Sequence, residues 1–188
     1  MNKRILLITP FFAPETHAAV FRVHKLAKYL NREKWEVHVL TVDTNYLYNE
    51  DENLLEELEG ITIHRSKYIE PTLRGLRMWL TGKDLTFKTL KKRGFYADNC
   101  MSPNNFSKKK SLPNLKARVY GYILERYSKN PDRYWTWKKN AIKTAEKLIN
   151  EHQIDLIYTT CLPFTSNSIG ITLRKKHEFL LPLSSVKF

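Results

Sequence analysis

The sequence is short of cysteine, since only Cys100 and Cys161 occur among its 188 residues. Two cysteines cannot form a disulfide framework, so the composition predicts a chain that folds around a hydrophobic core in a reducing cytoplasm. Long apolar runs are also missing. Residues 5–8 form a run too short for a secretory signal, and no run approaches the roughly 20 residues of a membrane-spanning helix. We therefore expect neither a signal peptide nor a membrane span.

Glycine-rich nucleotide motifs are absent as well. No G-x-G-x-x-G follows the first apolar run, and no P-loop occurs in the chain. This argues against a stand-alone Rossmann-type nucleotide binder. No helix-turn-helix, zinc-finger or RNA-recognition pattern is present, so the sequence offers no motif for nucleic acid. A non-catalytic basic module that binds nucleic acid or an anionic membrane remains the alternative function class.

Positive charge is what the sequence has in excess, and most of it lies in one segment. The net charge is +13, and residues 73–131 hold 14 basic and three acidic residues, a net of +11. Such a field attracts lipid headgroups, nucleic acid or phosphorylated substrates, and its simplest reading is a solvated basic surface. Helical spacing at residues 73–80 and 112–127 flanks a predicted loop at residues 94–111.

One end of this segment has the composition of an interfacial helix. Trp79 and Leu80 stand beside several basic residues, and basic amphipathic helices lie on anionic lipid. The chain is thus expected to be cytoplasmic or peripheral on the inner face of the cytoplasmic membrane. The predicted membrane-binding residues are Arg74, Arg77, Trp79 and Lys83.

Outside the basic segment, strand and helix patterns alternate. Strand patterns occupy residues 4–9, 35–42, 61–64 and 155–159, and helical spacing occupies residues 18–32, 54–58, 134–151 and 165–176. The alternation predicts an α/β, Rossmann-like domain with a mainly parallel sheet and helices on both faces. Ligands of such sheets bind where the strands end, which here means the loops at residues 10–17 and 160–164.

Several local predictions accompany these elements. Asp132 is expected to cap the helix that follows it, and Thr165 or Ser166 to cap the last helix. Trp137 is expected in the core, with its neighbours Tyr134 and Trp135 partly exposed. Cys161 is expected to be a small buried side chain, because no histidine partner suggests a nucleophile.

Two blocks of the sequence resemble one protein family. The first, ILLITPFFAPETHAAVFRVHKLAKYLNREKWEVHVLTV, opens the chain, and the second runs from NPDRYWTWKK through DLIYTTCLPFTSNSIG. Both resemble the N-terminal domain of family 4 glycosyltransferases of the GT-B fold, and the resemblance skips the basic middle. It implies that residues 1–188 form one acceptor-side Rossmann-like domain with a basic insertion at about residues 73–131.

The resemblance also implies a division of labour. In that family the N-terminal domain binds the acceptor, while a C-terminal domain binds a nucleotide-sugar donor through a Glu-x7-Glu motif. Transfer retains the anomeric configuration and needs no metal. The chain ends before that domain, so we expect a fragment without activity of its own and without a cofactor or metal. The expected partners are a glycan or lipid-linked acceptor of cell-surface polysaccharide synthesis and a separately encoded C-terminal domain.

The first loop and helix supply most of the candidate acceptor-binding residues. Arg22 matches the family's helix arginine and can reach a phosphate or form a surface ion pair. The family's glycine pair is replaced by two alanines, so side chains such as Glu15 and His17 would have to bind the acceptor. Alternatively, Glu15 is a first-turn acid and His17 an exposed loop histidine. Thr16 completes this set.

The second loop supplies the others. Thr165 and Ser166 match the family's block, and both can instead serve as helix caps. Asn167 stands where the family often has histidine, and its amide can bind a hydroxyl but cannot carry a proton at neutral pH. No catalytic residue is assigned.

Overall fold

The structure, a computed structural model, describes residues 3–47, 50–82, 122 and 132–177. The statements below concern these residues. The helix and loop predicted at residues 112–127 and 94–111 lie outside them, apart from Tyr122, as does Lys83. The side chain of Arg74 is not described either.

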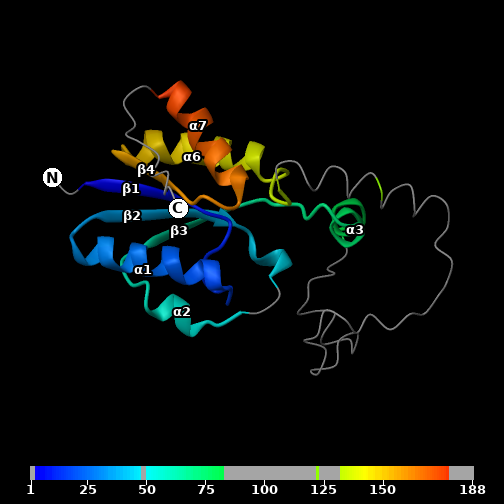
Figure 1. Cartoon of the computed structure of the whole chain (residues 1–188), viewed down its shortest axis with the longest axis horizontal. Coiled ribbons are helices and arrows are strands. Elements are labelled where there is room, and N and C mark those ends of the chain that lie inside the picture. The colour runs from blue at the N-terminus through cyan, green and yellow to red at the C-terminus, as the bar shows by residue number, and fades with distance from the viewer. Residues whose placement is uncertain (1–2, 48–49, 83–121, 123–131, 178–188) are drawn as a thin grey trace.

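Four parallel strands form a single sheet in the order β3-β2-β1-β4 (Figure 1). The strands are β1 (Arg4–Ile8), β2 (Glu36–Val42), β3 (Thr62–Ser66) and β4 (Leu156–Thr159). After its first residue β2 is buried throughout, as expected of a parallel strand covered on both faces. The prediction of an α/β protein with a parallel sheet is therefore confirmed.

Helices cover both faces of this sheet. In Figure 1, α1 (Ala18–Arg32) and the short α2 (Asn53–Glu56) lie below it, and α6 (Lys138–His152) and α7 (Phe164–Lys176) lie above it. Each face has its own apolar cluster: Leu7 and Val39 pack with α1, whereas Leu6 and Leu40 pack with α6 and α7. The alternation of side chains along β1 and β2 divides the core in this way.

Two further elements follow strands on the way to the basic segment. A 3-10 turn, η1 (Thr44–Tyr46), follows β2, and α3 (Leu73–Thr81) begins after β3. Thr72 caps α3, because its hydroxyl accepts a hydrogen bond from the N–H of Gly75 at 3.1 Å. The helix lies at one side of the domain in Figure 1, and Met78 packs against the α6 and α7 cluster.

The predicted start of α6 is wrong by four residues. Asp132 is not its cap, because residues 133–137 form turns and Trp137 takes the N-cap position. Trp137 is fully buried as predicted, and Trp135 is exposed. Tyr134, however, is only 6% exposed, which corrects the prediction for it. Tyr134 is buried because its ring packs against those of Phe11 and Tyr68, which come from distant parts of the sequence.

The predicted cap of α7 is also wrong. Pro163 takes the N-cap position, and Thr165 and Ser166 lie inside the first turn. Cys161 is exposed rather than buried. The reason is local, since Cys161 follows the last buried threonine after β4 and lies in a turn beside the exposed Leu162.

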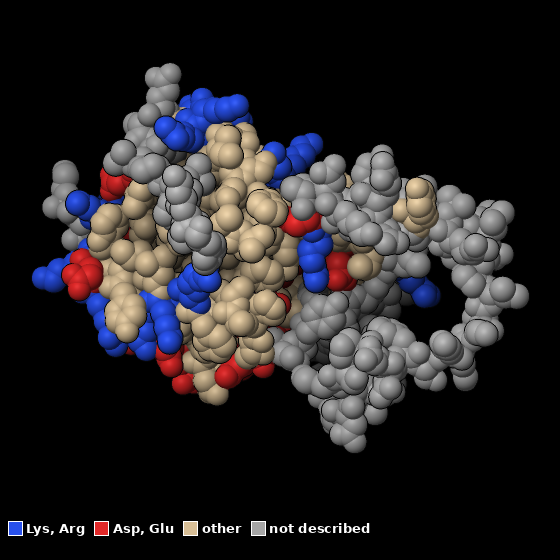
Figure 2. Space-filling model, in the orientation of Figure 1, with Lys and Arg blue, Asp and Glu red and all other residues tan. Residues whose placement is uncertain are grey.

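Charges of both signs lie on the described surface. Figure 2 shows basic side chains at the end of α7, where Arg174, Lys175 and Lys176 follow one another, and acidic side chains around α2. Most of the strongly basic segment lies outside the described residues. Within the described ones, none of the helices is both long and apolar enough to cross a membrane.

Candidate functional site

The strand order gives the sheet a topological switch point between β1 and β4. From β1 the chain passes through α1 to β2 and then β3 on one side, whereas β4 pairs with the other side of β1. In open parallel sheets, the crevice beyond the carboxyl ends of two such strands is where ligands bind. The loops after β1 and β4 meet there, and the hydroxyl of Thr160 donates to that of Thr9 at 3.4 Å.

Aromatic rings gather around the loop after β1. The rings of Phe11 and His17 stack with centroids 5.2 Å apart, and the ring of Tyr134 meets Phe11 edge-on at 5.4 Å. The ring centroids of Tyr68 and Tyr134 are 5.2 Å apart. Phe11 is partly buried and His17 is exposed. The cluster therefore rests on the core and presents an aromatic face to solvent.

Charged groups lie next to these rings. The guanidinium carbon of Arg133 lies 5.4 Å from the ring centre of Tyr134, a cation–π contact, and Arg133 Nη2 donates to Glu70 Oε1 at 3.2 Å. Burial raises the pKa of the Glu15 carboxyl, and the nearby charges of His17 and Arg133 oppose that rise. The structure thus brings the basic Arg133 and the acidic Glu15 and Glu70 from distant parts of the sequence to the same edge of the sheet.

A residue from β3 holds the loop in place. Arg65 Nη2 donates to the carbonyl of Ala13 at 2.7 Å, and its Nη1 donates to the carbonyl of Val42 at 3.3 Å. Ala13 lies in the loop after β1 and Val42 is the last residue of β2, so the guanidinium joins this loop to the end of β2. The N–H of Asp51 adds a bond to the carbonyl of Pro14 at 2.8 Å. This loop is therefore shaped by side-chain and backbone bonds rather than by glycines.

The predicted residues of the first loop take different places. Glu15 is partly buried, whereas Thr16 and His17 are exposed. His17 is the N-cap of α1, because its Nδ1 accepts from the N–H of Ala19 at 3.2 Å. Arg22 is exposed on α1.

The predicted residues of the second loop lie deeper. Thr165 and Ser166 are both fully buried. The amide oxygen of Asn167 accepts from the hydroxyl of Thr159 at 3.0 Å, so this amide already has a partner in β4. Thr165 and Ser166 are thus not accessible to a ligand at the surface, whereas Asn167 is partly exposed.

Sequence reasoning missed the residues that complete this edge. No sequence motif or spacing pointed to Phe11, Tyr68 or Glu70 as site residues. Arg133 could have been noticed, because it lies in the NPDRYW stretch that carries the family resemblance. Its proximity to Glu15 depends on the strand order, which places the loop after β1 beside the turns before α6.

Surface hollows are found elsewhere on the domain. One of about 410 Å³ lies between α1 and α2 and is lined by Phe21, His24 and Lys28 among others. Another of about 400 Å³ lies at the end of α6, beside Gln153 and Asp155. Neither includes a residue of the edge just described. The candidate site is therefore argued from its side-chain chemistry and its place in the topology.

The structure defines a parallel α/β protein, with charged and aromatic side chains gathered where the loops after β1 and β4 meet. Comparisons of the chain with protein-family models, curated proteins and solved structures found no match.

Proposed function

We propose that this chain is the acceptor-binding domain of a retaining, family 4-like glycosyltransferase. The observation that supports the proposal is the meeting of the two blocks that resemble that family. Phe11 from the first block and Tyr134 from the second meet edge-on, with ring centroids 5.4 Å apart, at the switch point of the sheet. The hydroxyl of Thr160 in the second block also donates to that of Thr9 in the first block, at 3.4 Å.

The side chains at this edge suit a polyhydroxylated or phosphorylated acceptor. The stacked Phe11 and His17 offer a ring face to a sugar. Glu15 can accept hydrogen bonds from hydroxyls. Arg133 can bind a phosphate or carboxylate with two N–H groups, while Glu70 holds its position. The acceptor would thus be oriented by side chains, with donor binding and sugar transfer left to a second domain.

The direct test is carbohydrate binding. We expect the purified chain to bind a subset of a glycan microarray, with the affinity then measured calorimetrically for the strongest ligand. Glu15→Gln and Arg133→Gln should each weaken that binding by about tenfold, the worth of one charged hydrogen bond. Lys25→Ala, an exposed change on α1 away from this edge, is the control and should bind normally. Absence of glycan binding, or equal losses in all three variants, would contradict the proposal.

A second test concerns catalysis. Residues 1–188 alone should release no nucleotide from common nucleotide sugars, because they contain no Glu-x7-Glu motif of the kind that binds the donor in that family. Turnover by the purified chain would overturn this division of labour. A neighbouring reading frame that encodes a Glu-x7-Glu Rossmann-like domain would support it, since that domain could supply the donor site.

Exposed apolar residues on α3 favour a second role, contact with anionic membranes. Trp79 is 56% exposed and Leu80 is 65% exposed, and Arg77 beside them is exposed too. Apolar and basic side chains together suit the lipid interface. The chain should sediment with anionic vesicles but not with neutral ones, and salt should weaken the binding. Trp79→Ser should weaken it as well, and equal binding to both kinds of vesicle would contradict this role.

A further inference from the structure

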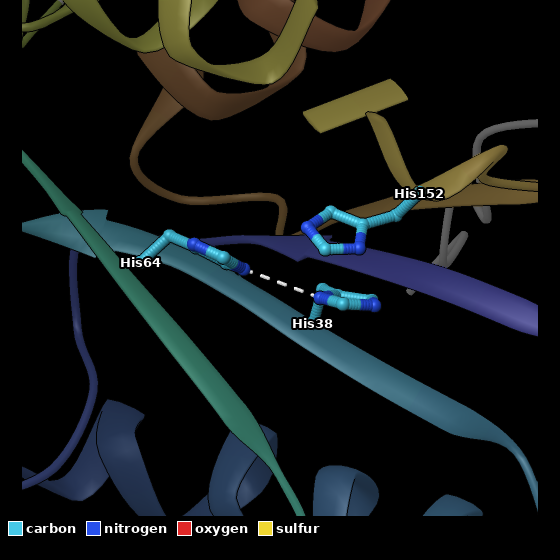
Figure 3. Close-up of side chains that lie close together, drawn as sticks. All are labelled: His38, His64 and His152. Carbon is cyan, nitrogen blue, oxygen red and sulfur yellow. Dashed lines mark hydrogen bonds between the residues drawn. The ribbon is translucent and has the colours of Figure 1, made fainter. Parts of the chain in front are cut away.

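Three of the six histidines lie together on one face of the sheet. His38 comes from β2, His64 from β3, and His152 is the last residue of α6. Figure 3 shows His64 and His38 pointing toward one another from adjacent strands, with His152 above them. Their ring centroids are 4.4 to 5.9 Å apart. Residues distant in the sequence thus converge toward the amino ends of the strands, away from the candidate acceptor site.

The ring nitrogens are spaced as metal ligands require. One nitrogen from each histidine lies within 4.8 Å of the others, and His38 Nδ1 is 3.2 Å from His64 Nε2. Tetrahedral zinc with Zn–N bonds near 2.0–2.1 Å holds its nitrogens about 3.3 Å apart. The first two ligands already have that separation. The nitrogen of His152 lies within 4.8 Å of them, and this partly buried side chain at a helix end would have to move closer to bind the same ion.

A carboxylate orients the most buried ring. Glu36 Oε1 lies 3.2 Å from His38 Nε2, and an ionised carboxylate can only accept, so Nε2 carries the hydrogen. The lone pair of His38 Nδ1 then accepts a hydrogen bond from His64 Nε2, shown dashed in Figure 3. A bound metal ion would take the place of that hydrogen between the two nitrogens. Carboxylate–histidine–metal arrangements fix the tautomer of a ligand in this way.

The positive charge of Arg4, which lies next to the three histidines, already has oxygen partners. Arg4 Nε donates to Glu36 Oε2 at 3.0 Å, and Arg4 Nη1 donates to the carbonyl of His152 at 3.0 Å. The guanidinium is thus directed at oxygen atoms around the cluster. The same two bonds support the site, because they position the carboxylate and the end of α6 that carries the third imidazole.

We propose that His38, His64 and His152 form a binding site for a divalent transition-metal ion of the zinc type. Three imidazole nitrogens suit zinc and its transition-metal neighbours and do not suit magnesium or calcium, which prefer oxygen. A fourth position stays open to water. The ion would join the edge strand β3 to β2 and to the end of α6, which is a stabilising role. The site lies apart from the proposed acceptor surface, so its test does not depend on the glycosyltransferase proposal.

The test is metal titration of the full chain, prepared without a histidine tag and freed of metal by a chelator. Calorimetry should show one Zn²⁺ per chain, and Co²⁺ should give the visible absorption of a low-symmetry nitrogen site. Zn²⁺ should also raise the unfolding temperature, because it binds the folded state. His64→Gln and His152→Gln should each weaken Zn²⁺ binding by at least about 100-fold, and Glu36→Ala by about 10- to 100-fold.

His177→Gln is the matched control, because His177 follows α7 and is not part of the cluster. It should bind Zn²⁺ as the unmodified chain does. His152→Gln changes a partly exposed side chain, so circular dichroism without metal should show a folded protein. The proposal is overturned if the unmodified chain binds no Zn²⁺ at micromolar concentration. It is equally overturned if folded His152→Gln binds normally, or if His177→Gln loses as much affinity as the cluster variants.

Discussion

Thr165 donates both its backbone N–H and its hydroxyl hydrogen to the carboxylate of Asp132, each over 2.7 Å. The same carboxylate accepts from the N–H of Tyr134 at 2.8 Å. Asp132 therefore stabilises the first turn of α7 from a position 33 residues earlier in the chain, while it also shapes the turns that lead into α6. An acid at a helix N-terminus is favoured by the helix dipole as well.

Asp132→Ala should lower the free energy of unfolding by about 2 kcal/mol, the worth of a helix cap that also makes charged hydrogen bonds. Thr165→Val, which removes only the hydroxyl bond, should cost about 1 kcal/mol. Urea unfolding of both variants and of the double variant measures this. Since the two changes remove a shared bond, the double variant should cost less than the two single costs combined. Strict additivity would show that the pair does not interact.

The packing of α7 on β4 depends on a small residue. A Cβ at Gly170 would lie 2.7 Å from Cγ2 of Thr159, closer than such atoms approach. Gly170→Ala should therefore destabilise the fold by about 1–3 kcal/mol, even though alanine favours helices by about 1 kcal/mol. Thr159→Ser removes that methyl group and keeps the hydroxyl that bonds Asn167. In the Thr159→Ser background, Gly170→Ala should cost clearly less, as thermal unfolding would show, and an unchanged cost would refute the contact.

Glu15 should make stability depend on pH. Burial raises the pKa of its carboxyl above 4.5 in the folded state, so the folded chain holds this proton more tightly than the unfolded chain does. Stability is then lost as pH rises from 4.5 through the folded-state pKa. Glu15→Gln lacks this loss, and its stability relative to the unmodified chain should rise over that window and level off above it.

The control for this pH effect is Glu57, whose pKa is lowered by its hydrogen bond to Lys28 and by the charge of that lysine. Its contribution is present above pH 4.5 and is lost as pH falls through the lowered pKa, so Glu57→Gln should shift stability in the opposite sense. The effect should be small, because the pair is at the surface. Urea unfolding across this pH range tests both variants. A pH-independent difference for Glu15→Gln would contradict the burial of that carboxyl.

One residue after α1 has a backbone conformation that suits glycine. Lys34 has φ of 63°, and its N–H donates to the carbonyl of Asn31 at 3.1 Å. Lys34→Gly should raise the free energy of unfolding by about 0.5–1 kcal/mol, because the left-handed conformation costs a lysine more than a glycine. Lys25→Gly, at an exposed position inside α1, should lower it by about 1 kcal/mol. Changes of the same sign would show that Lys34 is not in this conformation.

The elements with a strong local signal could be predicted from the sequence. The bounds of α1 match the prediction because Val20, Val23 and Ala27 repeat at helical spacing and face the sheet. β1 and β2 were predicted because their apolar runs are short and bounded by turn residues. The turns before α6 were not predicted, because the spacing of the buried Tyr134 and Trp137 also fits one face of a helix.

In the candidate sites, too, some residues could be predicted from local sequence patterns and others could not. Glu15 and His17 could be predicted from the sequence, because ligands of parallel α/β folds bind at loops that follow the strands. Arg133 could not be joined to them, and neither could His64 and His152 be joined to His38. These contacts join residues from about 26 to more than 100 positions apart, and local patterns carry no information on such pairs.

By itself, the sequence determined the alternation of strands and helices, the concentration of positive charge in residues 73–131, and the lack of glycine motifs, because these follow from composition and short-range periodicity. Only the tertiary structure decided which loops share an edge and which histidines share a face. The strand order β3-β2-β1-β4 and the parallel register place these residues together. That order is selected by the burial of two apolar faces at once, a property of the whole chain rather than of any segment.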